Sequence, residues 1–246
     1  MNQTVTVITP TTGTQYLKKA VESIQKQTYK HIQHLIVVDG KKYLDKVADI
    51  LKDTDISNRL VDVIPLPYPT GEDRFNGHRI YGASIYLCKG DFVCFLDEDN
   101  WYDETHVESL MEAISGKGWA YSLRKIVDAE GNYVCNDDCE SLGNYPSILD
   151  ERDYFVDVNC FFLPKEVALQ TSPIWYRKAR EPGVPEVDRF LTHVLRSNNL
   201  AQECTGQYTV NYRAGNTERS VKKEFFINGN EIMIEKYKGE FPWRKK

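Results

Sequence analysis

The stretch Phe92-Val93-Cys94-Phe95-Leu96-Asp97-Glu98-Asp99-Asn100 decides the fold, because five apolar residues run directly into three acids. A short apolar run of this kind predicts a buried strand. Carboxylates at its end are costly to bury unless a cation neutralises them. Carboxylate oxygens suit Mn²⁺ or Mg²⁺, so the stretch predicts a divalent-metal site for a phosphate-bearing substrate. The alternative is an acidic turn before a helix near Thr105, with Asp103 as its N-cap.

Composition limits the classes of protein that remain. The chain has 246 residues, of which 41% are apolar and 27% charged, as in an ordinary globular protein. This length fits one large α/β domain, or one domain with an extension. The net charge of −5 argues against nucleic acid as the main partner. The N-terminus lacks the features of a secretory signal, so we expect a cytoplasmic protein.

Strand and helix patterns alternate along the first half of the chain. The predicted strands cover residues 5–8, 35–38, 61–64 and 92–96, and the predicted helices cover residues 17–24, 44–51, 80–87 and 107–114. Turn-forming residues predict loops at 9–13 and 65–77. Strand followed by helix, repeated in this way, predicts an α/β fold with a Rossmann-like, doubly wound, mostly parallel sheet. Ligands of such sheets bind at the carboxyl ends of the strands.

The second half is less regular. We expect strands at 119–123 and 156–163 and a helix at 187–195. The tail from Val221 alternates basic and aromatic residues, which predicts a frayed, solvated end. Weak contact of this tail with an anionic membrane surface is the alternative, and would make the protein peripheral to a membrane. We therefore expect one domain over residues 1–220 and a C-terminal extension over residues 221–246.

Several phosphate-binding classes are excluded by their missing motifs. The loop after the first strand has a single glycine, Gly13, so the three-glycine dinucleotide fingerprint is absent. No Gly-Lys-Ser/Thr sequence occurs, which excludes a P-loop. The glycine-rich loop expected of a sugar nucleotidyltransferase is also missing after the first strand.

Five segments, in order, carry a resemblance to a known family. They are Val5-Thr6-Val7-Ile8-Thr9-Pro10, Ser23-Ile24-Gln25-Lys26-Gln27-Thr28-Tyr29, Val37-Val38-Asp39-Gly40, the stretch from Lys89 to Asn100, and Glu186-Val187-Asp188-Arg189-Phe190-Leu191. Together they resemble the GT-A fold glycosyltransferases of family 2, the SpsA-like inverting nucleotide-sugar transferases. The resemblance covers roughly residues 3 to 215 and implies a GT-A fold with an irregular, acceptor-side second half.

The resemblance implies a nucleotide site at the strand ends. Its nucleotide-binding residues would include Thr9, Pro10, Asp39, Asp97 and Glu98, with Thr9 and Asp39 in contact with the base and Asp97 near the ribose. Seen without the resemblance, Asp39 before Gly40 is simply a turn residue.

The resemblance also implies the charged groups around the diphosphate. Arg79 would lie near it, although Arg74 and His78 compete for that role. Asp99 would bind the Mn²⁺ or Mg²⁺ ion that bridges the diphosphate.

The catalytic base implied by the resemblance is Asp188. The alternative is an acid placed in the first turn of a helix by the helix dipole. Two departures from the family pattern occur: Gly215 stands about where a metal-binding His is common, and Val187-Asp188 replaces an Asp-Asp pair, which makes Glu186 a second candidate acid.

These residues together predict an inverting glycosyltransferase. It would move a sugar from a nucleoside-diphosphate donor, with UDP favoured, to a hydroxyl of a glycan, lipid-linked or other acceptor. The metal would neutralise the departing diphosphate and a carboxylate would take the proton of the hydroxyl. The alternatives are a nucleotidyltransferase, which releases pyrophosphate, and a sugar-nucleotide-binding domain without turnover.

Overall fold

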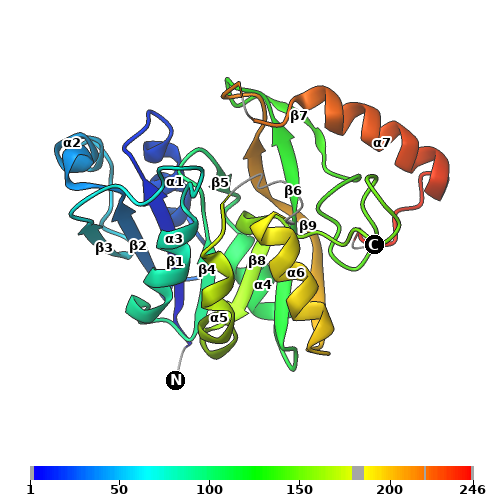
Figure 1. Cartoon of the computed structure of the whole chain (residues 1–246), viewed down its shortest axis with the longest axis horizontal. Coiled ribbons are helices and arrows are strands. Elements are labelled where there is room, and N and C mark those ends of the chain that lie inside the picture. The colour runs from blue at the N-terminus through cyan, green and yellow to red at the C-terminus, as the bar shows by residue number, and fades with distance from the viewer. Residues whose placement is uncertain (1–2, 179–185, 219, 245–246) are drawn as a thin grey trace.

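A computed structural model describes residues 3–178, 186–218 and 220–244. Its described part contains one nine-stranded sheet in the order β3-β2-β1-β4-β8-β6-β9-β5, with β7 paired to β6 (Figure 1). The strands are β1 Val5–Thr11, β2 Ile32–Val38, β3 Leu60–Pro65, β4 Phe92–Phe95, β5 Trp101–Tyr102, β6 Trp119–Val127, β7 Tyr133–Asn136, β8 Phe161–Pro164 and β9 Gln202–Arg213.

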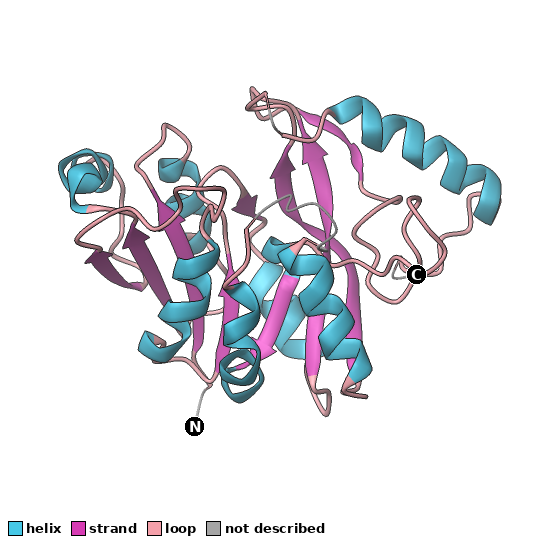
Figure 2. Ribbon diagram, in the orientation of Figure 1, coloured by secondary structure: helices cyan, strands magenta, loops and turns pink. Residues whose placement is uncertain are grey.

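Helices cover both faces of this sheet. Figure 2 shows α3, α5 and α6 on one face and α1 and α4 on the other. The helices are α1 Leu17–Gln25, α2 Leu44–Lys52, α3 His78–Ser84, α4 His106–Ala113, α5 Lys165–Thr171, α6 Val187–Ser197 and α7 Lys223–Tyr237, with short 3-10 turns that include Ile85–Leu87 and Ser172–Trp175. The predicted α/β class and mostly parallel sheet are confirmed.

The first half follows the sequence prediction closely. β3, β2, β1 and β4 are parallel neighbours, so the carboxyl ends of β1, β2 and β4 meet at one edge. One difference concerns residues 9–11, which were expected in a loop but continue β1 beside β2. Successive residues of β1 direct their backbone N–H groups alternately toward β2 and toward β4. The nitrogen of Pro10 faces the β4 side, where β4 has already ended, so its missing N–H costs no hydrogen bond of the sheet.

The second half contains strands that the sequence patterns did not reveal. β5, β7 and β9 were not predicted, because β5 and β7 are only two and four residues long and β9 carries many half-buried polar side chains. β8 starts at Phe161, later than expected, because residues 158–160 form a 3-10 turn. β8 is antiparallel to both β4 and β6, and so joins the regular half to the rest of the sheet.

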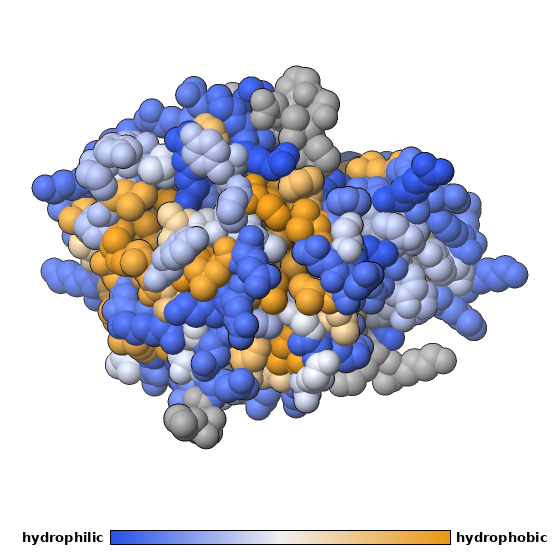
Figure 3. Space-filling view, turned by 60° about the horizontal axis from the view of Figure 1, so that its bottom comes forward, coloured by the Kyte–Doolittle hydropathy of each residue, from blue (hydrophilic) through white to orange (hydrophobic). Residues whose placement is uncertain are grey.

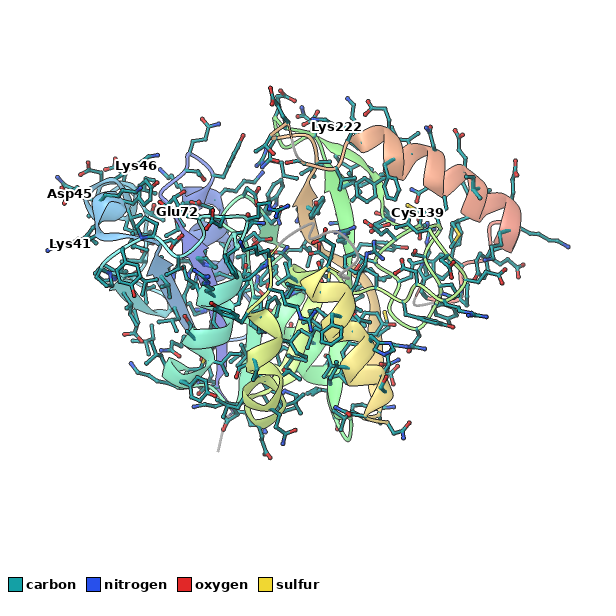
Figure 4. All side chains as sticks on the ribbon, viewed as in Figure 1. Lys41, Asp45, Lys46, Glu72, Cys139 and Lys222 are labelled. Carbon is teal, nitrogen blue, oxygen red and sulfur yellow. The ribbon has the colours of Figure 1, made fainter. Side chains whose placement is uncertain are left out.

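The C-terminal segment is ordered, and the expectation of a frayed end is wrong for its described part. Helix α7 buries Phe226 and Met233, and the residues after it bury Trp243, in a second apolar cluster against β6. A Cβ atom on Gly229 would come 2.7 Å from Sγ of Cys139, so glycine permits this close approach; Figure 4 shows Cys139 beneath α7. The division of the chain at residue 220 stays a prediction.

The surface mixes apolar and charged areas. On the face presented in Figure 3, hydrophilic side chains separate the apolar areas from one another. Among the described residues, no helix combines the length and the apolar character required to span a bilayer.

Candidate functional site

A cavity of about 570 Å³ lies at the carboxyl ends of β1, β2 and β4. Its wall is made by these strand ends, by the loop after β3 and by the end of β9. Figure 4 shows one lining residue, Glu72, on the α2 side of the molecule. The lining residues are Pro10, Thr11, Thr12, Thr14, Tyr16, Asp39, Tyr43, Pro69, Gly71, Glu72, Asn76, Gly77, Asp97, Glu98, Asp99, Asn100, Tyr212, Arg213, Asn216, Thr217 and Ser220.

Glu98 fastens the loop between β1 and α1. Its Oε2 accepts hydrogen bonds from Thr11 Oγ1 at 2.6 Å and from the Thr14 N–H at 2.9 Å. Its Oε1 accepts from the N–H and the hydroxyl of Thr12, both at 3.1 Å. With both oxygens engaged, this carboxylate shapes the cavity wall through the loop.

Asp39 fastens the loop after β3 in a similar way. Its Oδ1 accepts hydrogen bonds from the N–H and hydroxyl of Thr70 at 2.6 and 2.8 Å, and its Oδ2 accepts from the Gly71 N–H at 2.9 Å. A Cβ atom on Gly71 would meet Asn76 O at 2.5 Å and Asp39 Oδ2 at 2.8 Å, so the turn requires glycine. Contact of Asp39 with a base stays a prediction.

Thr9 and Pro10 differ in their relation to the cavity. Pro10 lines it. Thr9 is fully buried, and its hydroxyl lies 2.9 Å from Nε2 of His34, within the sheet. The structure therefore does not bring the Thr9 side chain to the cavity wall, where Thr11 and Thr12 lie instead.

Asp97 is held at the base of the cavity by two neighbours. Its Oδ1 accepts a hydrogen bond from the Tyr81 hydroxyl at 2.6 Å. Asn159 donates from Nδ2 to Oδ2 at 3.0 Å and accepts the Asp97 N–H at 2.7 Å. Burial raises the pKa of Asp97 and these hydrogen bonds oppose the rise. Asn159 was not predicted, and no local sequence signal distinguishes it.

Asp99 lies next to it with part of its surface open to the cavity. Asn216 donates a hydrogen bond to Oδ2 at 2.5 Å. Burial, followed by the negative charges of Asp97 and Glu98, raises the pKa of Asp99 to about 7. A carboxylate that neighbouring negative charge destabilises in this way would gain from a bound cation.

The donor set at this site fits a cation that is completed by a substrate. Within the described ranges, no group of three or more His, Cys, Asp and Glu side chains is placed to hold a metal. Mg²⁺ commonly binds through one or two carboxylates together with substrate phosphates and water. Asp99, with one oxygen not bonded to Asn216, meets that requirement.

Among the described residues, the guanidinium group that lines the cavity belongs to Arg213, at the end of β9, and not to Arg79. Arg213 donates from Nε to Asp99 O at 3.1 Å and from Nη1 to Ala129 O at 2.6 Å. It also lies over the ring of Tyr16, with Cζ 4.3 Å from the ring centroid. Arg79 is not among the lining residues. The sequence could not reveal Arg213 because β9 was not predicted.

Asp188 is half-buried in the first turn of α6 and does not line the cavity. The Arg189 N–H donates to its Oδ1 at 2.9 Å. Burial, followed by the negative charge of Asp157, raises the pKa of Asp188 to about 8. A helix dipole alone would lower this pKa, so burial outweighs the dipole. The carboxyl thus releases its proton near pH 8, and its ionised form can act as a base.

A buried network connects the surroundings of Asp97 and Asp188. Arg124 donates to Asp137 at 2.8 Å, to Glu140 at 2.7 Å and to Asp157 at 2.5 Å. Asp157 in turn accepts from Nδ2 of Asn159 at 2.8 Å. Its charge raises the pKa of both Asp97 and Asp188, so it lies within electrostatic range of each.

A signal for this network was present in the sequence, because Arg124 interrupts a run of strand-forming residues. A charged residue at such a buried position requires partners.

The remaining acid of the sequence argument is Asp103. It was considered as the N-cap of the helix near Thr105, but that helix has no side-chain cap hydrogen bond. Asp103 accepts a hydrogen bond from Asn211 at 2.8 Å and forms an ion pair with Lys125. It therefore connects β9 and β6, and it is not among the residues that line the cavity.

Comparison with known proteins places these features in a family. The profile of the family described as glycosyl transferase family 2 matches residues 6–150. The amylovoran biosynthesis glycosyltransferase AmsB of Erwinia amylovora is 24% identical over 180 residues, which cover 70% of this chain and 54% of that protein. The glycosyltransferase GlyG of Streptococcus pneumoniae is 27% identical over 161 residues, covering 64% and 47%. The chain thus spans about half the length of these relatives.

Solved structures share the fold. The crystal structure of S. aureus TarS 1-349 in complex with UDP-GlcNAc has a TM-score of 0.61 and 15% sequence identity. The similarity covers 94% of this chain and 65% of the TarS chain. The structure described as the crystal structure of S. aureus TarS 1-349 has a TM-score of 0.59 and 16% identity, covering 85% of this chain and 60% of that one.

Proposed function

The chain belongs to glycosyl transferase family 2 and has the GT-A fold, and from this premise we propose that it is an inverting, metal-dependent glycosyltransferase with a UDP-sugar donor. One observation carries the proposal. The carboxylates of Asp97, Glu98 and Asp99 and the guanidinium of Arg213 line a single cavity at the carboxyl ends of the strands. Carboxylates can bind the metal ion of a metal–diphosphate group, and a guanidinium can bind its phosphates.

The donor would lie with its base toward β2 and its diphosphate toward β4. Pro10 and Asp39 line the former side, and Asp99 and Arg213 the latter. We propose Arg213, in place of Arg79, as the basic residue that meets the diphosphate. UDP is the first nucleotide to test, since one of the structures with this fold is described as a complex with UDP-GlcNAc.

Asp99 would hold the Mn²⁺ or Mg²⁺ ion, with Asn216 orienting its carboxylate. When bound, the ion would neutralise charge on the diphosphate leaving group. The protein's own part is to keep the cluster of acids close together, through Asn159 at Asp97 and through the threonines at Glu98.

Asp188 would act as the general base. The acceptor oxygen would bond to the anomeric carbon as its proton passes to Asp188, while the bond from that carbon to the diphosphate oxygen breaks. Attack from the face opposite the leaving group inverts the anomeric centre. The pKa of Asp188, raised by burial to about 8, supports this role.

A thermal-shift panel tests the donor assignment. UDP, GDP and dTDP sugars would be titrated with and without Mn²⁺, and a ligand that binds the folded state raises its stability by about 2.7 kcal/mol at a hundredfold excess over Kd. We expect the largest shift with UDP-sugar and Mn²⁺ together. Release of pyrophosphate during turnover would favour a nucleotidyltransferase. Donor binding without any transfer, across a broad set of acceptors, would favour a binding domain.

A further inference from the structure

A group of cations and aromatic rings lies outside the cavity and has no part in donor binding as proposed above. Arg79, Arg177 and Lys178 lie around the rings of Phe75 and Tyr176, and we name these five residues the basic aromatic patch. Cζ of Arg79 lies 3.4 Å from the centroid of the Phe75 ring and 5.0 Å from that of Tyr176. Nζ of Lys178 lies 5.3 Å from the Phe75 ring.

The cations of the patch are not neutralised within the described part of the chain. None of the ion pairs formed there involves Arg79, Arg177 or Lys178. Arg79 makes two long hydrogen bonds, to Thr70 O at 3.3 Å and to the Tyr176 hydroxyl at 3.5 Å. Its Nε is buried without a partner among the described residues. Aromatic faces compensate a cation only in part, so the patch is suited to receive an anion.

The patch lies between the donor cavity and helix α6, which carries the proposed base. Asn76 and Gly77, which directly follow Phe75 in the chain, line the cavity. On the other side, Cζ of Arg177 lies 3.9 Å from the ring of Phe190 in α6, the helix that also carries Asp188. A molecule bound to the patch would therefore lie between the cavity and α6.

Two further features are typical of a ligand site. Tyr176 is 69% exposed although it packs against Phe75, with ring centroids 5.5 Å apart, so one face of its ring is open to a sugar. The loop before α3 holds Asp73, Arg74 and Asn76 at φ values of 57°, 70° and 49°. Such left-handed backbone in residues other than glycine is costly and concentrates at functional sites.

We propose that the basic aromatic patch binds an anionic acceptor, a glycan that carries carboxylate or phosphate groups, and directs its hydroxyl to Asp188. The acidic groups would pair with Arg177, Lys178 and Arg79, while a sugar ring would stack on Tyr176. This inference rests on the proposed transfer function, because it names the acceptor class of that reaction.

Binding of defined oligosaccharides tests the proposal without any need for turnover. The probes would be a fluorescein-labelled oligogalacturonide, which carries carboxylates, and a neutral malto-oligosaccharide of equal length, with polyphosphate as competitor. We expect the parent to bind the acidic probe and not the neutral one, with weaker binding at higher salt. Stronger competition by polyphosphate than by unlabelled oligogalacturonide would assign phosphate as the preferred acidic group, and the reverse would assign carboxylate.

Matched variants locate the binding. Arg177→Gln with Lys178→Gln should weaken binding of the acidic probe about tenfold or more. Lys52→Gln with Lys236→Gln removes the same charge at exposed positions on α2 and α7 and should leave binding within about twofold. Lys178→Gln alone, and a thermal unfolding curve of each variant, guard against a folding defect.

Three results would overturn the inference. The first is equal binding of the acidic and neutral probes, and the second is an equal loss of acidic-probe affinity in the patch and control variants. The third is binding of phosphatidylglycerol vesicles without binding of the acidic oligosaccharide, which would assign the patch to a membrane surface. UDP titration of the same variants separates the two proposals. Normal UDP affinity without acidic-probe binding contradicts only the acceptor inference, whereas absence of UDP binding in the parent contradicts the proposed function.

Discussion

Asn159 and Asp97 form a reciprocal pair, in which the Asn159 amide donates to Oδ2 at 3.0 Å and accepts the Asp97 N–H at 2.7 Å. The same amide donates to Asp157 at 2.8 Å. Two carboxylates that would repel each other are thus held by one neutral side chain. This arrangement keeps Asp97 in place at the floor of the cavity before any ligand arrives.

Replacement of Asn159 should therefore loosen the acid cluster. Asn159→Ala leaves Oδ2 of Asp97 without a donor and the Asp97 N–H without its acceptor, and we expect a loss of about 1–3 kcal/mol in the free energy of unfolding, with weaker UDP binding. Urea denaturation and UDP titration measure the two effects. Asn132→Ala, which removes an exposed amide–carboxylate contact with Asp128 at 3.1 Å, is the control. Equal small effects in both variants would contradict a special role for Asn159.

Glu98 should act on donor binding through the loop that it holds. In Glu98→Gln one acceptor oxygen becomes an amide donor that faces the donors of the loop, so residues 11–14 should lose their fixed position. We expect about 1–3 kcal/mol lower stability and weaker UDP binding. The exposed Glu104→Gln serves as a control for loss of one charge nearby. Unchanged stability with reduced UDP affinity would instead indicate direct contact of Glu98 with the nucleotide.

Arg213 and Arg79 can be distinguished by the phosphates of the ligand. If Arg213 meets the diphosphate, Arg213→Gln should weaken UDP binding by about tenfold or more, as loss of a charged hydrogen bond requires, and leave uridine binding nearly unchanged. Arg79→Gln, tested in parallel, should change UDP affinity little because Arg79 lies outside the cavity. The opposite result would restore the assignment made from the sequence.

The difference between these two arginines illustrates how far sequence reasoning reaches. The parallel half of the sheet was predictable, because the strands around Val7, Val37 and Val93 are buried apolar runs separated by helical patterns. The acids at the ends of β2 and β4 therefore came together as expected. Arg213, Asn159 and Asn216 reach the site from β9, from a 3-10 turn and from a loop, whose positions depend on tertiary contacts and not on local periodicity.

Buried side chains account for the other differences. Thr9 was expected at the nucleotide, but its position in the ladder directs its hydroxyl to His34. The C-terminal tail, which alternates basic and aromatic residues, was expected to be a frayed and solvated end, yet Phe226, Met233 and Trp243 fill a core against β6. Long basic side chains alternate with these apolar residues in the sequence, so the pattern alone does not indicate that the apolar ones are buried.

Asp99 should connect nucleotide binding to the metal. Asp99→Ala removes the carboxylate proposed to hold the ion, so UDP-sugar should bind more weakly and Mn²⁺ should no longer improve its affinity. Calorimetric titration of UDP-sugar with and without Mn²⁺ measures both effects. Asn216→Ala, which removes only the hydrogen bond to Oδ2, should retain a smaller Mn²⁺ effect. A variant at Asp99 with the parent's Mn²⁺ dependence would make the acid cluster a structural turn.

Asp188→Asn should separate catalysis from binding. The amide keeps the size of the side chain but cannot accept a proton, so the transfer rate should fall by about 10²–10⁴ while donor affinity stays near that of the parent. In the parent, kcat/KM should rise with pH up to and through about 8, because burial raises the pKa of Asp188 and only the ionised form is a base.

The stability of the same variant supplies an independent check. The folded pKa of about 8 lies above the ordinary value of 3.8, so the parent should lose stability as pH rises from about 4 to about 8, because over this range the unfolded chain releases the proton that the folded carboxyl keeps. Asp188→Asn has no such carboxyl and so lacks this loss. The free energy of unfolding of the variant, relative to that of the parent, should therefore be higher at pH 9 than at pH 4. Urea denaturation at the two pH values measures the difference. Retained transfer activity in Asp188→Asn would refute the assignment of the base, and Glu186→Gln would then be the next variant to measure.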